Sequence, residues 1–210
     1  MANKDDISMA VIKRLPRYYR FLGELKKNGV VRISSRELSE RMGLTASQIR
    51  QDFSRYGGLG HQGYGYNVEK LHHEMGEFLG LQNRHAAILV GGGNLGRAVA
   101  NHIYSQAGGF DLIGIFDRKQ SLTGQMIRDI PVRHIDGLDE FCREQRPIVA
   151  ILCVPEDAAR DLVEQLIGLG VKAFWNFSSY DISLDYPEVP VENVHIGDSL
   201  MTLCYKISQE

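Results

Sequence analysis

The hydrophobic positions of this chain change their spacing near residue 80. Before that point, apolar residues recur every three or four positions, as in Leu15, Tyr18 and Leu22, which indicates amphipathic helices. After it, short apolar runs such as 85–90 and 147–154 alternate with helical stretches, the pattern of a parallel sheet covered on both faces. The pattern predicts a helical domain over 1–80, an α/β domain over 81–195 and a separate C-terminal helix over 196–210.

The first domain contains start and stop signals for two short consecutive helices. Ser34 and Glu37 have the spacing of a capping box, and Gly43 would end the helix that they begin. Thr45 and Gln48 form a second capping box two residues later. Two short helices joined at such a turn predict a helix-turn-helix within the segment Tyr18–Tyr56.

The second of these helices has one small apolar side and a broad polar side. Ile49 and Phe53 would face the core, which leaves Ser47, Gln48, Arg50, Gln51, Ser54 and Arg55 on other sides. Such side chains can reach base edges and phosphates in a DNA major groove. A solvated polar helix face is the alternative interpretation.

Glycines alternate with aromatic residues over 56–67. This composition is unsuited to a helix and predicts a hairpin with its tip at His61, Gln62 and Gly63. Directly after a recognition helix, such a hairpin would be a wing that enters an adjacent minor groove. A flexible linker is the alternative, although three tyrosines are many for a spacer.

Charge is unevenly distributed between the two halves. The net charge is −2, but residues 13–58 hold 11 Lys and Arg against 4 Asp and Glu, a local net of +7. A basic N-terminal part on an acidic body indicates a polyanionic partner for the first domain.

The start of the second domain carries a dinucleotide-binding fingerprint. The apolar run 85–90 leads into Gly91, Gly92, Gly93, Asn94, Leu95 and Gly96, and a helical stretch and a second apolar run then end at Asp117. In this motif the first glycine permits the turn, the second admits the pyrophosphate, and the third lets helix and strand pack closely. Asp117 stands where a carboxylate accepts both ribose hydroxyls of an adenosine. Ligands of doubly wound sheets lie beyond the carboxyl ends of the strands, so Val154-Pro155 and Asn176-Phe177 complete the predicted rim.

The last residues form a helix with an apolar face that requires a covering surface. Ile196, Leu200, Leu203 and Ile207 lie on that face. The helix could fold back on its own domain, but a DNA-binding head of this type usually works in pairs, so we expect exchange across a homodimer.

Several classes of protein are disfavoured by the composition. No apolar run approaches the ~20 residues of a membrane helix, and the N-terminus has no apolar core like that of a signal peptide, so a cytoplasmic protein is expected. The three cysteines are far apart, and we expect no metal site.

The order of these features resembles the Rex family of redox-sensing transcriptional repressors. The resemblance covers nearly the whole chain, and its most specific stretches are 14–20, 49–54, 63–68 and 93–96. It implies a homodimeric repressor with a winged-helix domain, a Rossmann domain and a swapped C-terminal helix. Such a repressor binds palindromic double-stranded DNA and is released by NADH, with NAD+ competing.

The resemblance also implies which residues bind each partner. The implied DNA contacts are Arg14, Ser47, Gln48, Arg50, Gln51, Ser54, Arg55, His61, Gln62, Gly63 and Tyr64. The implied NADH/NAD+ contacts are Gly91, Gly92, Gly93, Asn94, Leu95, Gly96, Asp117, Val154 and Pro155. Asp117 favours NAD(H), although the basic Arg118 could accommodate a 2′-phosphate.

Two other functions fit a glycine loop of this kind. A small NAD-dependent dehydrogenase would need a substrate domain and a positioned acid or base, and residues 81–195 barely complete the nucleotide fold. A module that binds CoA or another nucleotide in a protein–protein switch is the second alternative. Turnover with NADH and an aldehyde-type substrate would indicate the first, and competition by CoA but not NADH the second.

Overall fold

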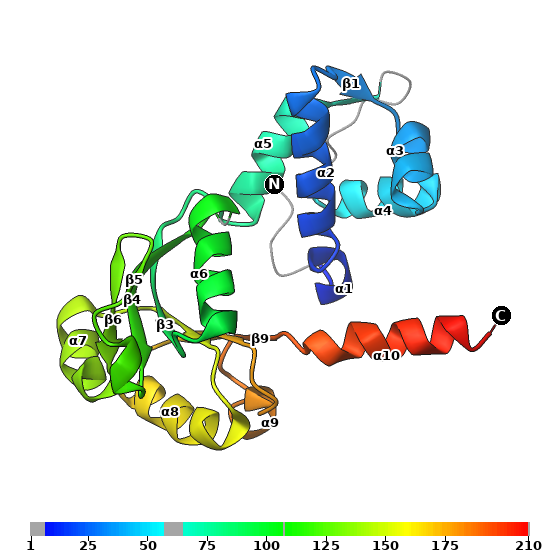
Figure 1. The fold of residues 1–210 in the computed structure, drawn as a ribbon. Coiled ribbons are helices and arrows are strands. Elements are labelled where there is room, and N and C mark those ends of the chain that lie inside the picture. The colour runs from blue at the N-terminus through cyan, green and yellow to red at the C-terminus, as the bar shows by residue number, and fades with distance from the viewer. Residues whose placement is uncertain (1–6, 57–64, 107, 210) are drawn as a thin grey trace. The chain divides into compact units, whose positions relative to one another are not determined.

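The computed structural model describes residues 7–56, 65–106 and 108–209, and the chain divides into two compact units (Figure 1). We call Met1–Gln82 the head unit and Asn83–Glu210 the sheet unit. The predicted hairpin tip, with His61, Gln62, Gly63 and Tyr64, lies outside the described residues.

The head unit is mainly helical, as predicted. Its elements are α1 (Met9–Ile12), α2 (Leu15–Lys27), β1 (Arg32–Ile33), α3 (Ser35–Met42), α4 (Ala46–Tyr56), β2 (Tyr66–Asn67) and α5 (Val68–Phe78). Strands β1 and β2 pair antiparallel, with Ile33 opposite Tyr66. Tyr66 and Asn67, the last residues of the predicted hairpin segment, therefore pair with the chain just before α3.

The helix signals read from the sequence are observed at α3. Ser34 accepts the backbone N–H of Glu37, the Glu37 carboxylate accepts the backbone N–H of Ser34, and Gly43 ends the helix in the left-handed conformation with φ 64°. The second capping box is only half formed. Thr45 Oγ1 accepts the backbone N–H of Gln48, but the Gln48 side chain donates to Asp52 instead of returning to Thr45.

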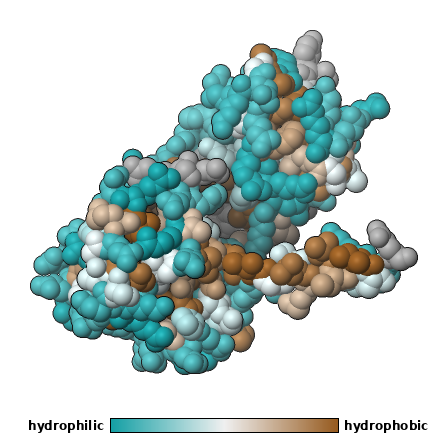
Figure 2. Space-filling model, viewed as in Figure 1, coloured by the Kyte–Doolittle hydropathy of each residue, from teal (hydrophilic) through white to brown (hydrophobic). Residues whose placement is uncertain are grey.

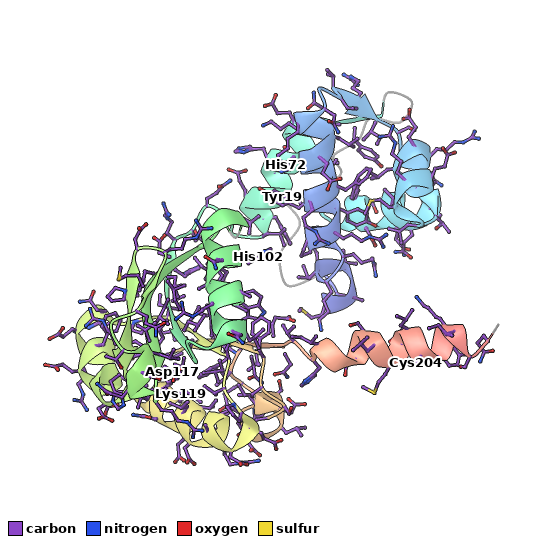
Figure 3. The ribbon with its side chains drawn as sticks, in the orientation of Figure 1. Tyr19, His72, His102, Asp117, Lys119 and Cys204 are labelled. Carbon is purple, nitrogen blue, oxygen red and sulfur yellow. The ribbon has the colours of Figure 1, made fainter. Side chains whose placement is uncertain are left out.

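Helix α5 packs against α2 within the core of the head unit. Tyr19 stacks on His72 with ring centroids 4.1 Å apart, and both side chains lie between the two helices in Figure 3. A Cβ at Gly23 would lie 3.2 Å from His72, and one at Gly76 would lie 3.1 Å from Tyr19. The two glycines thus make room for the aromatic stack. The buried apolar residues of this core are Ile7, Val11, Leu15, Tyr18, Leu22, Leu25, Ile33, Leu38, Met42, Ile49, Phe53, Val68, Leu71 and Met75.

The sheet unit is a doubly wound α/β fold, which confirms the predicted Rossmann architecture. Its elements are β3 (His85–Val90), α6 (Asn94–Gln106), β4 (Phe110–Asp117), η2 (Gln120–Leu122), β5 (Met126–Ile127), β6 (Ile130–His134), η3 (Ile135–Gly137), α7 (Leu138–Gln145), β7 (Val149–Leu152), α8 (Glu156–Gly168), β8 (Ala173–Asn176), α9 (Ile182–Asp185), β9 (Val191–Asn193) and α10 (Ile196–Ile207). The strand order is β5-β6-β4-β3-β7-β8-β9, parallel except for the β5-β6 pair.

The strand order creates a topological switch between β3 and β7. From β3 the chain first adds β4 and β6 on one side, then returns to add β7, β8 and β9 on the other. Helix α6 packs on one face of the sheet with Val99 and Ile103, whereas α7 and α8 pack on the opposite face (Figure 1). Ligands of such sheets bind at the carboxyl ends of the strands beside the switch.

Helix α10 exposes its apolar residues. Figure 2 shows a hydrophobic stripe along this helix, and Ile196, Leu200, Met201, Leu203, Tyr205 and Ile207 are between 50% and 66% exposed.

Among the described residues, no helix is long and apolar enough to cross a membrane. The described residues also contain no group of three or more His, Cys, Asp or Glu side chains that could hold a metal ion.

Candidate nucleotide site and DNA-binding surface

The glycine loop lies between β3 and α6, beside the switch point. Gly91 has φ +105°, and a Cβ there would lie 2.3 Å from the carbonyl oxygen of Cys153. A Cβ at Gly96 would lie 1.9 Å from the carbonyl oxygen of Gly91, because the first turn of α6 presses on the loop. Both positions therefore require glycine for the fold itself.

Gly93 differs from these two glycines. An added Cβ at Gly93 would meet nothing within 4 Å, and its φ is not in the left-handed region. Gly93, Asn94 and Leu95 are exposed, while the flanking Gly92 and Gly96 are buried. The fold thus gives no reason for a glycine at position 93, and close approach by a ligand supplies one.

Asp117 ends β4, next to the glycine loop. Its side chain is 8% exposed, Oδ2 accepts the backbone N–H of Gly92 at 2.8 Å, and Oδ1 accepts that of Lys119 at 2.8 Å. Figure 3 shows Asp117 and Lys119 together at this end of the strand. The predicted ribose-binding acid therefore also holds the loop in place, and each oxygen keeps a second lone pair for a hydroxyl donor.

The residues that follow β7 lie beside the glycine loop. Val154 is half-buried, and its Cγ1 would lie 3.1 Å from a Cβ at Gly91. Pro155 is exposed and stands at the N-cap of α8. The segments 91–96 and 153–155 are therefore neighbours at the carboxyl edge of the sheet.

The segment after β8 borders the same edge. Phe177 donates its backbone N–H to the carbonyl of Leu152 at 2.9 Å, while Asn176 is fully buried. Asn176 Nδ2 donates to Asn193 Oδ1 at 2.9 Å, which ties the ends of β8 and β9 together. The residues just after β8 and just after β9 line a cavity of about 280 Å³: Phe177, Ser178, Ser179, Val194, His195, Ile196, Gly197 and Asp198. The role of Asn193 was not apparent from the sequence, because nothing local marks a three-residue strand.

In the head unit, the exposed side of α4 carries most of the predicted DNA contacts. Ser47, Arg50, Gln51 and Ser54 are exposed, and Ile49 and Phe53 are buried as predicted. Arg50 also donates to Ser35 Oγ on α3 at 3.2 Å. Arg55 lies in α4, but its side chain is outside the described part of the structure.

Two predicted DNA contacts, Arg14 and Gln48, share one intramolecular partner, the carboxylate of Asp52. Arg14 donates from Nε and Nη2 to Asp52, at 2.8 and 2.7 Å, and Gln48 Nε2 donates to Asp52 Oδ1 at 2.8 Å. Tyr18 Oη completes the set with a 2.8 Å bond to Asp52 Oδ2. The sequence did not reveal this network, because Asp52 is separated from Tyr18 by 34 residues and from Arg14 by 38.

The Asp52 network joins a buried carboxylate to a partly exposed arginine. Asp52 is 1% exposed, and although its burial disfavours the charge, the hydrogen bonds from Arg14, Tyr18 and Gln48 lower the pKa of its carboxyl group. Burial and the bond to Asp52 raise the pKa of Tyr18. Asp52 is therefore a carboxylate that accepts four hydrogen bonds and joins α2 to α4.

These features define a class of protein: a helix-turn-helix head joined in one chain to a dinucleotide-binding unit of the Rossmann type. A family model for the N-terminus of a putative DNA-binding protein matches residues 6–54, and a CoA-binding domain model matches residues 82–180. The first match fits the head unit, and the second fits the sheet unit.

Whole-chain relatives specify the family. The redox-sensing transcriptional repressor Rex of Thermoanaerobacter pseudethanolicus is 49% identical over 210 residues, covering 100% of this chain and 93% of that protein. The Rex of Clostridium novyi is 47% identical, covering 99% of both chains. The chain therefore belongs to the Rex family of redox-sensing transcriptional repressors, which confirms a repressor and not a small dehydrogenase.

Solved structures agree with this assignment. A crystal structure of the repressor RSP in complex with β-NAD+ and operator DNA is 48% identical, with a TM-score of 0.88, and covers 97% of this chain and 93% of that one. RSP in complex with β-NADH is 46% identical, with a TM-score of 0.87, and covers 97% and 95%.

Proposed function

We propose that this chain is a homodimeric repressor that binds a palindromic DNA operator and releases it when NADH occupies the sheet unit. The observation that carries the proposal is the presence, in one chain, of a glycine loop held by Asp117 and an exposed polar face on α4. RSP, a close relative, has been crystallised with NADH and with NAD+ plus operator DNA.

In the sheet unit, the proposed site uses the carboxyl edge beside the switch point. The residues proposed to hold the pyrophosphate are Gly91, Gly92, Gly93, Asn94, Leu95 and Gly96, at the N-terminus of α6, where free N–H groups and the helix dipole favour an anion. Asp117 accepts the ribose hydroxyls, and its charge disfavours a 2′-phosphate. Val154 and Pro155 border the same edge, beside Gly91.

Sensing requires that NADH and NAD+ favour different states of the dimer. The two differ in the charge and planarity of the nicotinamide ring, so an apolar pocket discriminates between them. A tenfold change in operator affinity corresponds to about 1.4 kcal/mol of coupling. The proposed dimer contact is the apolar face of α10.

In the head unit, the proposed DNA contacts are the half-buried Gln48, the exposed residues of α4 and the predicted wing. Because its DNA target and its NADH signal share one compartment, we assign the repressor to the cytoplasm.

The test is an operator-binding measurement at one stated salt concentration, because phosphate contacts make affinity depend steeply on salt. A palindromic duplex is titrated with protein in the presence of NADH, NAD+, NADPH or CoA. NADH should weaken binding, NAD+ should oppose NADH, and NADPH and CoA should have little effect. Unchanged operator affinity at saturating NADH would contradict the proposal, and displacement by CoA alone would support a CoA-responsive switch.

A further inference from the structure

The carboxylate of Asp52 dictates how the amide of Gln48 is oriented. An ionised carboxylate only accepts hydrogen bonds, so the group of Gln48 that faces Asp52 has to be the NH2 group. The 2.8 Å contact joins Gln48 Nε2 and Asp52 Oδ1, one turn apart on α4. An amide that otherwise could turn by 180° is thereby held in one orientation.

The carboxylate itself is fixed from the opposite side. Arg14, at the N-cap of α2, donates to both oxygens of Asp52, and Tyr18 on α2 donates to Oδ2. The start of α2 therefore fixes the carboxylate to which the Gln48 amide donates. Opposite charge and hydrogen bonding lower the pKa of Asp52, which keeps the carboxyl group ionised at neutral pH. Every member of the network lies within the head unit.

The remaining polar atom of the Gln48 side chain is available to a ligand. Gln48 Oε1 has no hydrogen-bond partner among the described residues. Gln48 is half-buried, and its Oε1 is not among the buried, unpaired side-chain atoms of the described residues. Gln48 lies in the first turn of α4, between the exposed Ser47 and Arg50, and the N-terminal part of a recognition helix is the part that meets base edges.

We infer that Gln48 is a specificity-determining residue that presents a fixed hydrogen-bond acceptor to the major groove, and that Asp52 is the positioning residue that fixes it. The base it reads must offer a donor: the 6-amino group of adenine or the 4-amino group of cytosine. Adenine fits best, because the second N–H of the Gln48 amide can donate to N7 beside the amino group. This inference rests on the proposed function, because it requires operator binding.

The first experiment selects duplexes from a randomised pool with the full-length wild type, Gln48→Met and Asp52→Asn. Met removes both the donor and the acceptor at similar length, and Asn can face Gln48 with either end of its own amide. One position in each half-site should lose its preference in both variants, while the other positions keep theirs. The matched control is Gln165→Met, which removes a Gln–Asp contact of the same kind, to Asp139 in the sheet unit.

The second experiment deletes the predicted donor from the DNA. The test uses the operator position at which Gln48→Met loses its base preference. If that base is adenine, it is replaced by an analogue that lacks the 6-amino group; if it is cytosine, it is replaced by an analogue that lacks the 4-amino group. Loss of one hydrogen bond should weaken binding of the wild type about five- to tenfold. Gln48→Met should bind the two duplexes equally.

The outcomes separate the two proposals. If the wild type selects no duplex, the proposed function fails and this inference fails with it. Only the inference fails if the wild type selects a palindrome and Gln48→Met keeps the same base preference at every position. Only the inference fails, too, if removal of the amino group weakens binding of Gln48→Met as much as binding of the wild type. Gln48→Met keeps the test decisive if Asp52→Asn does not fold, and NADH binding by each variant checks that the sheet unit is intact.

Discussion

The carboxylate of Asp117 accepts the backbone N–H of Gly92 at 2.8 Å, so the acid at the end of β4 directly holds the glycine loop after β3. The same side chain accepts the N–H of Lys119, which positions the start of the following loop. Substitution of Asp117 will therefore disturb both a direct ligand contact and the shape of the loop.

We expect Asp117→Ala to weaken NADH binding about 10- to 100-fold, because hydrogen bonds to a charged group contribute about 1.5–3 kcal/mol. Discrimination against NADPH should fall in parallel, since the charge that opposes a 2′-phosphate is gone. Fluorescence titration with both nucleotides measures this. Asp111→Asn is a suitable control: Asp111 is also on β4 but pairs with Arg84 at the other end of the strand. Equal NADH affinity in Asp117→Ala and Asp111→Asn would refute the assignment.

Gly93 and Gly96 should respond differently to alanine. At Gly96 the new Cβ would lie 1.9 Å from the carbonyl oxygen of Gly91, so Gly96→Ala should destabilise the sheet unit, which urea denaturation will show. At Gly93 the space is open, so Gly93→Ala should fold with wild-type stability yet bind NADH weakly. Normal NADH affinity in a well-folded Gly93→Ala would argue against pyrophosphate binding at this loop.

The stability of the head unit should depend on pH through Asp52. Because the pKa of Asp52 is lower in the folded chain than in the unfolded chain, its charge adds to the free energy of unfolding, and this contribution is fully present above the ordinary carboxyl pKa. The contribution to the free energy of unfolding is lost as pH falls through the folded-state pKa. Asp52→Ala leaves the buried hydroxyl of Tyr18 without its acceptor, so the variant should be destabilised by about 1–3 kcal/mol at neutral pH.

The measurement for Asp52 is hydrogen exchange of head-unit amides across an acid-to-neutral pH series, compared between the wild type and Asp52→Ala. The difference in stability should shrink as the solution becomes more acidic. A difference that stays constant down to low pH would show that Asp52 contributes through packing and not through its charge.

The apolar face of α10 should hold the dimer together. Leu200 is 61% exposed in the described chain, and a charge placed there would be buried on association. We expect Leu200→Asp to be monomeric by sedimentation and to bind a palindrome much more weakly than the wild type. Ser199→Asp places the same charge at the neighbouring exposed position and should remain dimeric. A dimeric Leu200→Asp would place the subunit contact elsewhere.

Local signals explain which parts of this fold were predictable from the sequence. Ser34, Glu37 and Gly43 act within a single helix, and their roles were confirmed at α3. The glycine loop and the alternating apolar runs likewise depend on neighbouring residues, and the predicted doubly wound sheet is observed. Strands β5 and β9 were not predicted, because two or three residues carry too little periodicity to recognise.

Side-chain partners distant in sequence were beyond prediction. The pattern Thr45 to Gln48 predicted a capping box, but the buried carboxylate of Asp52 competes successfully for the Gln48 amide. Arg14 was expected to be available to DNA, yet two of its nitrogens contact Asp52. Both differences arise because burial makes an unpaired charge costly, and the sequence does not show which charges are buried.

The packing of α5 on α2 has a consequence for any fragment of this protein. The chain leaves the head unit through α5, and the stack of Tyr19 on His72, admitted by Gly23 and Gly76, joins that helix to its neighbour. A fragment that stops before Val68 would therefore lose Val68, Leu71 and Met75 from the head core, whereas a fragment that ends at Gln82 keeps them.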